Sequence, residues 1–193
     1  METRGLVCIK QNNELYGISN QFDSYYIGGL GFDLVKKIKQ FISCEDELNF
    51  FKQNLKTFEW TTDPGKISLS INTEDIVEII ASNRVLGLVS PNDNVRKIFE
   101  EDLKTIYNDS NFINDNLFCE WTYIIDLDQD QFIIKNPLIR ARNVQYYPPF
   151  KLWAMRHEKL LKMNIGPYNE IKFPLLDLDY ETILESVKKI QDV

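Results

Sequence analysis

The sequence predicts an α+β fold in which an antiparallel sheet, built from hairpins, has helices packed on it. Segments of strand-like composition occur in pairs joined by short polar turns, both near the start of the chain and in its second half. Segments with apolar residues at helical spacing lie between these pairs. No repeat, linker or shift in composition divides the chain, so we expect a single domain over residues 1–193.

The first pair of strands is predicted over residues 3–22. Residues 3–11 are rich in strand formers, and Asn12 and Asn13 make a turn pair that tolerates positive φ before residues 14–22 return. A loop over 23–31 follows and holds three of the eight glycines of the protein. Such a composition lets the backbone approach another group closely.

Helical segments continue the first half of the chain, each indicated by an apolar stripe. They are predicted over 32–42, 45–58, 72–82 and 91–107, with a turn and a short strand over 61–71. Two start signals support these bounds. Ser43 is suited to cap the second helix, whose first turn is acidic, and Ser90-Pro91 combines a cap with proline at the first helical position.

The second half begins with the clearest strand pattern, over 117–127. Cys119, Trp121 and Tyr123 are expected on one face of this strand, together with the apolar residues that follow them at alternate positions. Residues 128–130 turn the chain and 131–135 return as the hairpin partner.

The last third of the chain is less regular. Residues 137–149 read as irregular, and 150–163 are compatible with more than one structure. An edge strand is expected over 171–176, and Asp179 is suited to cap a final helix.

Composition excludes several classes of protein. A net charge of −7 opposes non-specific binding to nucleic acid and to an anionic membrane surface. No apolar run approaches the roughly 18 residues of a membrane span, and the first residues do not form a secretory signal. The three cysteines lack metal-binding spacing. We therefore expect a soluble cytoplasmic protein with reduced thiols, no metal and no cofactor.

Two stretches resemble a family of small uncharacterised proteins of phages, bacteria and fungi. The first comprises Thr3–Leu6, Gln21–Tyr25 and Gly29–Gly31, and is similar to an opening Met-Gly-Thr-Arg-Gly-Leu and a Gln-Trp-Asp-Gly-Tyr-Pro loop that ends in Gly-x-Gly. The second is Phe118–Asp128, which is similar to a Cys-Glu-Trp-x-Tyr-x-Ile-Asp-Leu-Asp strand. The resemblance implies a single domain and a phage-like origin, and it implies no particular activity.

The candidate site combines the start of the chain with the glycine-rich loop. Arg4 offers five donors to a phosphate or carboxylate, and free N–H groups where the loop meets the next helix could bind an anion. The candidate ligand-binding residues are Thr3, Arg4, Asp23, Tyr25, Gly29, Gly31, Glu120 and Arg156. In the alternative, Arg4 pairs with Asp23 or Glu120 and serves only to hold the hairpin.

Other motifs favour structural roles. Cys119 and the single histidine, His157, could form a thiol–imidazole pair, but the apolar neighbours of Cys119 favour a buried, inert thiol. Asp126, Asp128 and Asp130 alternate like the start of a calcium loop, yet the required glycine and glutamate are absent, which favours a hairpin turn. Basic residues over 151–162 are typical of a solvated face, and of a strand- or nucleotide-binding patch in the alternative.

Two hypotheses about function remain. The first is a binding protein that sequesters, or turns over, a small anionic, nucleotide-like ligand, which in a phage would counter host signalling. The second is an interaction protein that blocks a host protein through an acidic and aromatic surface without a ligand pocket. No nucleophile or metal set predicts an enzyme, and the sequence does not predict the oligomeric state.

Overall fold

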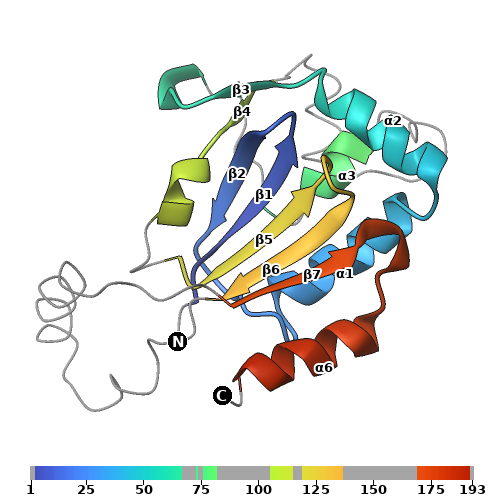
Figure 1. Ribbon diagram of the computed structural model, residues 1–193. Helices are drawn as coiled ribbons and strands as arrows, with labels where there is room; N and C mark the ends of the chain where they lie inside the picture. Colours follow the sequence, from blue (N-terminus) through green and yellow to red (C-terminus); the bar gives the residue numbers. More distant parts are fainter. Residues whose placement is uncertain are drawn as a thin grey trace, which may run out of the picture.

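The computed structural model describes residues 3–66, 73, 76–81, 105–114, 119–136 and 169–191. Within them, a five-stranded sheet in the order β2-β1-β5-β6-β7 is covered by helices, as Figure 1 shows. The predicted α+β class is therefore confirmed. The strands are β1 (Gly5–Gln11), β2 (Glu14–Asn20), β5 (Trp121–Asp126), β6 (Gln131–Asn136) and β7 (Asn169–Pro174).

The sheet is mostly antiparallel, with one exception at its centre. The β1–β2 and β5–β6 pairs are the two predicted hairpins, and β7 adds antiparallel to β6 as the predicted edge strand. The central pair of β1 and β5 is parallel, with Gly5 opposite Trp121 and Lys10 opposite Asp126. A parallel pair needs a long crossover, which the residues between the two hairpins supply.

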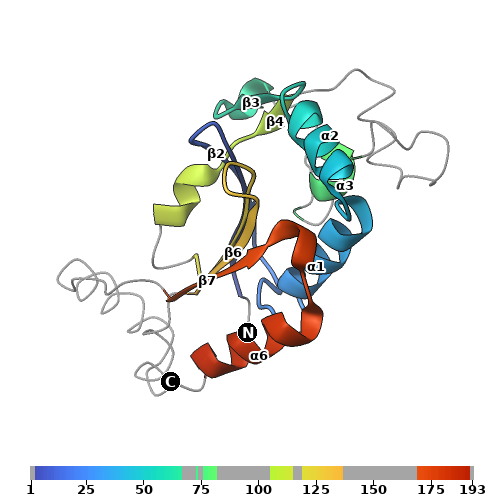
Figure 2. The same cartoon turned by 45° about the vertical axis from the view of Figure 1, so that its right-hand side comes forward.

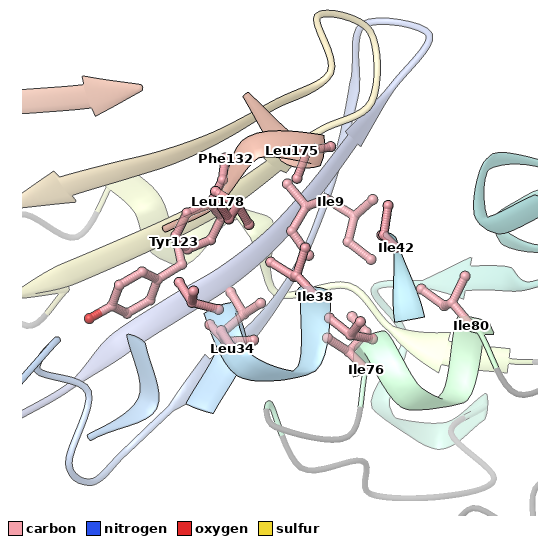
Figure 3. Packing of buried hydrophobic residues seen from close by; sticks show 14 of the residues in the cluster. Ile9, Leu34, Ile38, Ile42, Ile76, Ile80, Tyr123, Phe132, Leu175 and Leu178 are labelled. Atoms are coloured by element: carbon pink, nitrogen blue, oxygen red, sulfur yellow. The ribbon is translucent and has the colours of Figure 1, made fainter. Parts of the chain in front are cut away.

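In the part of the chain that the structure describes, four helices cover one side of the sheet: α1 (Leu30–Phe41), α2 (Glu45–Leu55), α3 (Ile76–Ala81) and α6 (Tyr180–Gln191). Figure 2 shows them together on that side, with the short helix η3 (Ser110–Asn114) on the other. The main core lies between the sheet and the helices, where residues such as Ile9, Leu34 and Ile38 are fully buried (Figure 3). Burial of each such side chain stabilises the fold by roughly 1.5–3 kcal/mol.

A second, smaller core lies on the opposite face of the sheet. Its buried members are Leu6, Cys8, Cys119, Ile124 and Ile133, with Leu15, Phe112 and Ile113 packed against them. The prediction that Cys119 shares a face with Trp121 and Tyr123 is therefore wrong. Cys119 precedes the first residue of β5, so the alternation of the strand does not extend to it.

A small parallel pair, β3 (Glu59–Thr61) and β4 (Thr105–Tyr107), lies outside the main sheet. The predicted helix over 91–107 is wrong at its last three residues, which form β4. Pairing of Trp60 with Ile106 overrides the helical spacing of the sequence there.

The cap residue of the last helix was predicted correctly, whereas the cap residue of α2 was predicted one position too early. The last helix is capped as predicted, since the N–H of Thr182 donates to the Asp179 carboxylate at 2.9 Å. For α2, Cys44 and not Ser43 is the cap residue. The Ser43 N–H and hydroxyl instead donate to the Glu47 carboxylate, at 2.9 and 2.6 Å.

Several predictions fall outside the described residues. These are the strand over 67–71, the helix over 91–107 before Thr105, the irregular segment 137–149, the segment 150–163, and the basic residues that include Arg156 and His157. Among the helices that the structure does describe, none has both the length and the apolarity to cross a bilayer.

Candidate functional site

The glycine-rich loop lies against the amino end of β1. The N–H of Ser24 donates to the Thr3 carbonyl at 3.2 Å, and the N–H of Glu120 donates to the Arg4 carbonyl at 2.9 Å. The structure therefore brings residues 3–5, 21–31 and 119–121 to one end of the sheet, named here the loop end. Of the eight predicted site residues, seven belong to it, and Arg156 lies outside the described residues.

Ser24 is the residue that fixes the loop in place. It is fully buried, its carbonyl accepts a hydrogen bond of 2.7 Å from the Tyr123 hydroxyl, and its own hydroxyl accepts one of 2.9 Å from the Asn20 amide. Gly5 makes this contact possible, since a Cβ there would lie 2.6 Å from the Ser24 Cβ. No pattern in the sequence indicates this role of Ser24, because Thr3 and Tyr123, the partners that hold it to the sheet, are remote in the chain.

The backbone donors at the start of α1 already have partners. The N–H of Leu30 donates to the Asp23 carbonyl at 3.0 Å, and the N–H of Gly31 donates to the Tyr25 carbonyl at 3.4 Å. These are two of the N–H groups that a helix start would otherwise offer to an anion. The loop satisfies them itself, so an anion at this end would depend on side chains such as Arg4.

Two of the glycines serve close packing. A Cβ on Gly29 would lie 2.5 Å from the Asp23 carbonyl oxygen, and a Cβ on Gly31 would lie 2.6 Å from both the Tyr123 hydroxyl and the Tyr26 ring. Gly28 differs, since its φ of +72° requires glycine-like freedom while nothing lies within 4 Å of a Cβ there. Asp23 also has positive φ, at +48°.

Under the loop lies an aromatic cluster that joins it to α6. The Tyr26 ring stacks on Tyr180 at a centroid distance of 6.4 Å, and Phe32 meets Tyr180 edge-on at 4.6 Å. The Tyr26 hydroxyl is fully buried and has no hydrogen-bond partner among the described residues. Burial, with Tyr180 and Asp179 nearby, raises the pKa of Tyr26, which keeps its hydroxyl neutral.

The outer side of the loop presents two large apolar side chains to solvent. Phe22 is 57% exposed and Ile27 is 41% exposed. The only other large apolar side chain of comparable exposure among the described residues is Leu176, in the short helix η4 (Leu175–Asp177). Because the loop is fixed in place, it would present these two side chains to a partner without the cost of ordering the loop.

The alternating aspartates form a hairpin turn, as favoured from the sequence. Asp126 accepts the N–H of Asp128 at 3.0 Å and pairs with Lys10 at 2.9 Å. Asp128 accepts the N–H groups of Asn12 and Asn13, at 2.6 and 2.9 Å. Each of these carboxylates is directed at protein donors, and the described part of the chain holds no group of three metal-ligating side chains.

Cys119 is buried, as expected from its apolar sequence neighbours. Its thiol lies 3.3 Å from the Thr122 hydroxyl and 3.7 Å from the Trp121 carbonyl. The nearby Cys8 thiol is also buried, and burial, with Cys119 close by, raises its pKa. A raised pKa keeps a thiol protonated and poorly nucleophilic. The histidine that could have paired with Cys119 lies outside the described residues.

Comparisons of this chain with protein-family models, with curated proteins and with solved structures gave no match.

Proposed function

We propose that this chain is a binding protein whose partner is another protein, contacted through the outer side of the loop over 21–28. The observation that carries the proposal is the combination of two properties in one segment. The loop exposes Phe22 and Ile27, and it is fixed to the sheet by hydrogen bonds of Ser24. A partner is then bound without the cost of ordering the loop.

The contacts within the loop end also favour a binding surface over a ligand pocket. Gly29 and Gly31 are in contact with protein atoms, and the first N–H groups of α1 donate to carbonyls of the loop. Aromatic side chains such as Phe22 are enriched at protein interfaces and contribute most when they enter a pocket of the partner. If the chain is of phage origin, as its resemblance implies, the partner is a host protein of the cytoplasm.

The test is photo-crosslinking in cells that produce the full chain. A photoreactive phenylalanine analogue replaces Phe22, Ile27 or, as control, Leu176, which is 40% exposed but lies in η4. We expect discrete adducts with one protein when the photoreactive residue is at position 22 or 27. The adducts from position 22 should disappear when Ile27 is changed to aspartate, and those from position 27 should disappear when Phe22 is changed to aspartate. Equal labelling from all three positions, or no adduct from the loop, contradicts the proposal.

A small anionic ligand is the second candidate. The observation that supports it is the hydrogen bond from the Ser24 N–H to the carbonyl of Thr3, the residue before Arg4. Arg4 is half-buried and already interacts with other groups of the protein. A ligand would therefore have to share Arg4 with these groups or displace them. Calorimetry against a panel of nucleotides tests this candidate. Tight binding that Arg4→Ala abolishes and Phe22→Ala leaves unchanged would favour it over the protein partner.

A further inference from the structure

The two outermost strands of the five-stranded sheet, β2 and β7, differ in the residues that they present at the edge. An open edge offers N–H and C=O groups to any extended segment, and proteins commonly block it with charged side chains or proline. On β7 the Leu175 N–H donates to the Asp130 carbonyl at 2.9 Å, so residue 174 and alternate residues before it direct their backbone groups away from β6. These outward residues are Glu170, Lys172 and Pro174, and all three are exposed. The β7 edge therefore carries both kinds of block.

Strand β2 has neither kind of block in its own sequence. Residues 15–22 contain no charged residue and no proline, and they include aromatic and β-branched residues. Exposed segments of this composition are prone to pair between chains. Gly17 marks the outward side of β2, because its N–H and its C=O both bind groups outside β1. Leu15 and Ser19 face the same way by alternation, so no outward position of β2 carries a charge.

The outward groups of β2 are bound by residues 108 and 109, which join β4 to η3. The Asn108 side-chain amide accepts the Gly17 N–H at 2.9 Å and donates to the Leu15 carbonyl at 3.4 Å. A residue of a parallel neighbouring strand would make the same two bonds, so this one amide takes the place of a strand. The Asp109 N–H donates to the Gly17 carbonyl at 2.7 Å. Figure 1 shows the chain passing from β4 along the outer side of β2 to η3.

Further contacts hold this short segment against β2. The Asn108 N–H donates to the Thr61 carbonyl at 2.7 Å, which joins the segment to β3. The Asn108 Oδ1 atom also accepts the Ser110 N–H at 3.1 Å. Gly17 lets the start of η3 come close, since a Cβ at residue 17 would lie 3.0 Å from the Ser110 Cα. The segment is therefore fixed on both sides of the point where it meets β2.

We propose that Asn108 and Asp109 form an edge block, which keeps β2 from pairing with β2 of a second copy of this chain. They bind the N–H and C=O groups of β2 that a second copy would need, on the edge that has no charge or proline of its own. A second copy is the expected occupant once the block is lost, because a two-fold axis brings the same strand of two molecules together in antiparallel orientation. This inference concerns the sheet edge and does not depend on the proposed function of the loop.

The test is Asn108→Ala in the full chain, studied by hydrogen exchange and by size-exclusion chromatography with light scattering. The variant removes both bonds of the side-chain amide, so the Gly17 N–H should exchange about tenfold faster at low protein concentration. The molar mass of the variant should rise with protein concentration to that of a dimer or a larger species, and that of the parent chain should not. Asn111→Ala, the same change at an exposed site in η3, is the matched control and should behave as the parent chain.

A second substitution distinguishes strand pairing from loss of the fold. Ser19→Lys places a charge at an outward position of β2, and lysine is a residue that blocks sheet edges. We expect the double variant Asn108→Ala/Ser19→Lys to have the molar mass and the circular dichroism spectrum of the parent chain.

Several results would overturn the edge block. Faster exchange at Gly17 without a rise in molar mass would show that the opened edge does not pair, and unchanged exchange would show that Asn108 does not cover it. Association that persists in the double variant would come from another surface or from unfolding. Association of the parent chain or of Asn111→Ala to the same extent as Asn108→Ala would show that these two residues do not keep the copies apart.

Discussion

The two ends of the central strands are held together by different kinds of interaction. The end where β1 and β5 finish is named here the turn end. There the Asp128 carboxylate joins the two hairpin turns by accepting the N–H groups of Asn12 and Asn13, and Asp130 joins its turn to helix α2 by pairing with Lys52 at 2.6 Å. At the loop end, the bonds of Ser24 join neutral groups, and packing of glycines against aromatic rings completes the contact.

The loop end is better suited than the turn end to bind a partner. At the turn end the acidic side chains are used to hold the fold, so they have less to offer a ligand. At the loop end the fold is held by backbone groups and Tyr123, and Phe22 and Ile27 are exposed to solvent. The comparison predicts that the two ends respond differently to mutation and to pH.

The largest expected effect is at Gly31. A methyl group there would meet the Tyr123 hydroxyl and the Tyr26 ring at 2.6 Å, so Gly31→Ala should lower the free energy of unfolding by about 3 kcal/mol. Chemical denaturation measures this change. In an open helix the same substitution stabilises by about 1 kcal/mol.

Gly28→Ala is the matched control, because a Cβ at residue 28 meets nothing and only its positive φ is penalised, by about 1–2 kcal/mol. A stable Gly31→Ala variant would show that the loop does not pack on the tyrosines in this way.

The next largest effect on the free energy of unfolding is expected from substitution of two buried tyrosines, which should differ in their response. Tyr123→Phe removes the donor to the Ser24 carbonyl and should cost about 2 kcal/mol, because a buried acceptor loses its partner. Tyr26→Phe removes a hydroxyl without a partner and should leave stability unchanged or raise it by about 1 kcal/mol. Thermal or urea unfolding of the two variants measures the difference, and equal losses would contradict the assigned hydrogen bonding.

A smaller effect on stability is expected at the turn end when the pH is lowered. The N–H groups of Asn13 and Asn12 lower the pKa of Asp128. A carboxyl group whose pKa is lower in the folded state stabilises the fold above its ordinary pKa, and this contribution is lost as the pH falls through the folded value. The protection factors of the Asn12 and Asn13 amides, which are exchange rates corrected for their intrinsic pH dependence, should therefore fall on acidification before the protection factor of Ser24 does.

Asp128→Ala should weaken the pH dependence of unfolding in the same acidic range, and Glu185→Ala, at an exposed site on α6, is the control. An unchanged pH profile in the Asp128 variant would show that the two turns are joined by other contacts.

The smallest effect on stability is expected at Phe22. Because its side chain is exposed, Phe22→Ala should change the free energy of unfolding by less than about 0.5 kcal/mol while it abolishes binding of the partner. Unfolding and crosslinking measured on the same variant check both parts. A large loss of stability would mean that Phe22 belongs to the fold and not to the binding surface.

Local patterns in the sequence were sufficient to predict the two hairpins and the cap of the last helix. Both hairpins, the asparagine turn with φ of +55° and +62°, and the aspartate cap of α6 were predicted because each depends on neighbouring residues. The helix predicted through Tyr107 failed for the opposite reason. Its last residues form β4 by pairing with β3, which lies more than forty positions earlier in the chain.

For the candidate site, the sequence indicated the segments but not their roles. Residues 3–5, 23–31 and 120 do lie together, as the hypothesis required. Gly29 and Gly31 were expected to free backbone for an anion, whereas they allow the loop to pack on Tyr25, Tyr26 and Tyr123.

The sequence by itself determined where the chain turns, which stretches pair as hairpins and which helix faces are apolar, because these depend on residues within a few positions of one another. The tertiary structure decided that β1 and β5 run in parallel, that Ser24 is held by Tyr123, and that Phe22 and Ile27 remain in solvent. These features arise from contacts between residues up to about a hundred positions apart. A local sequence pattern does not specify which distant residue will make such a contact.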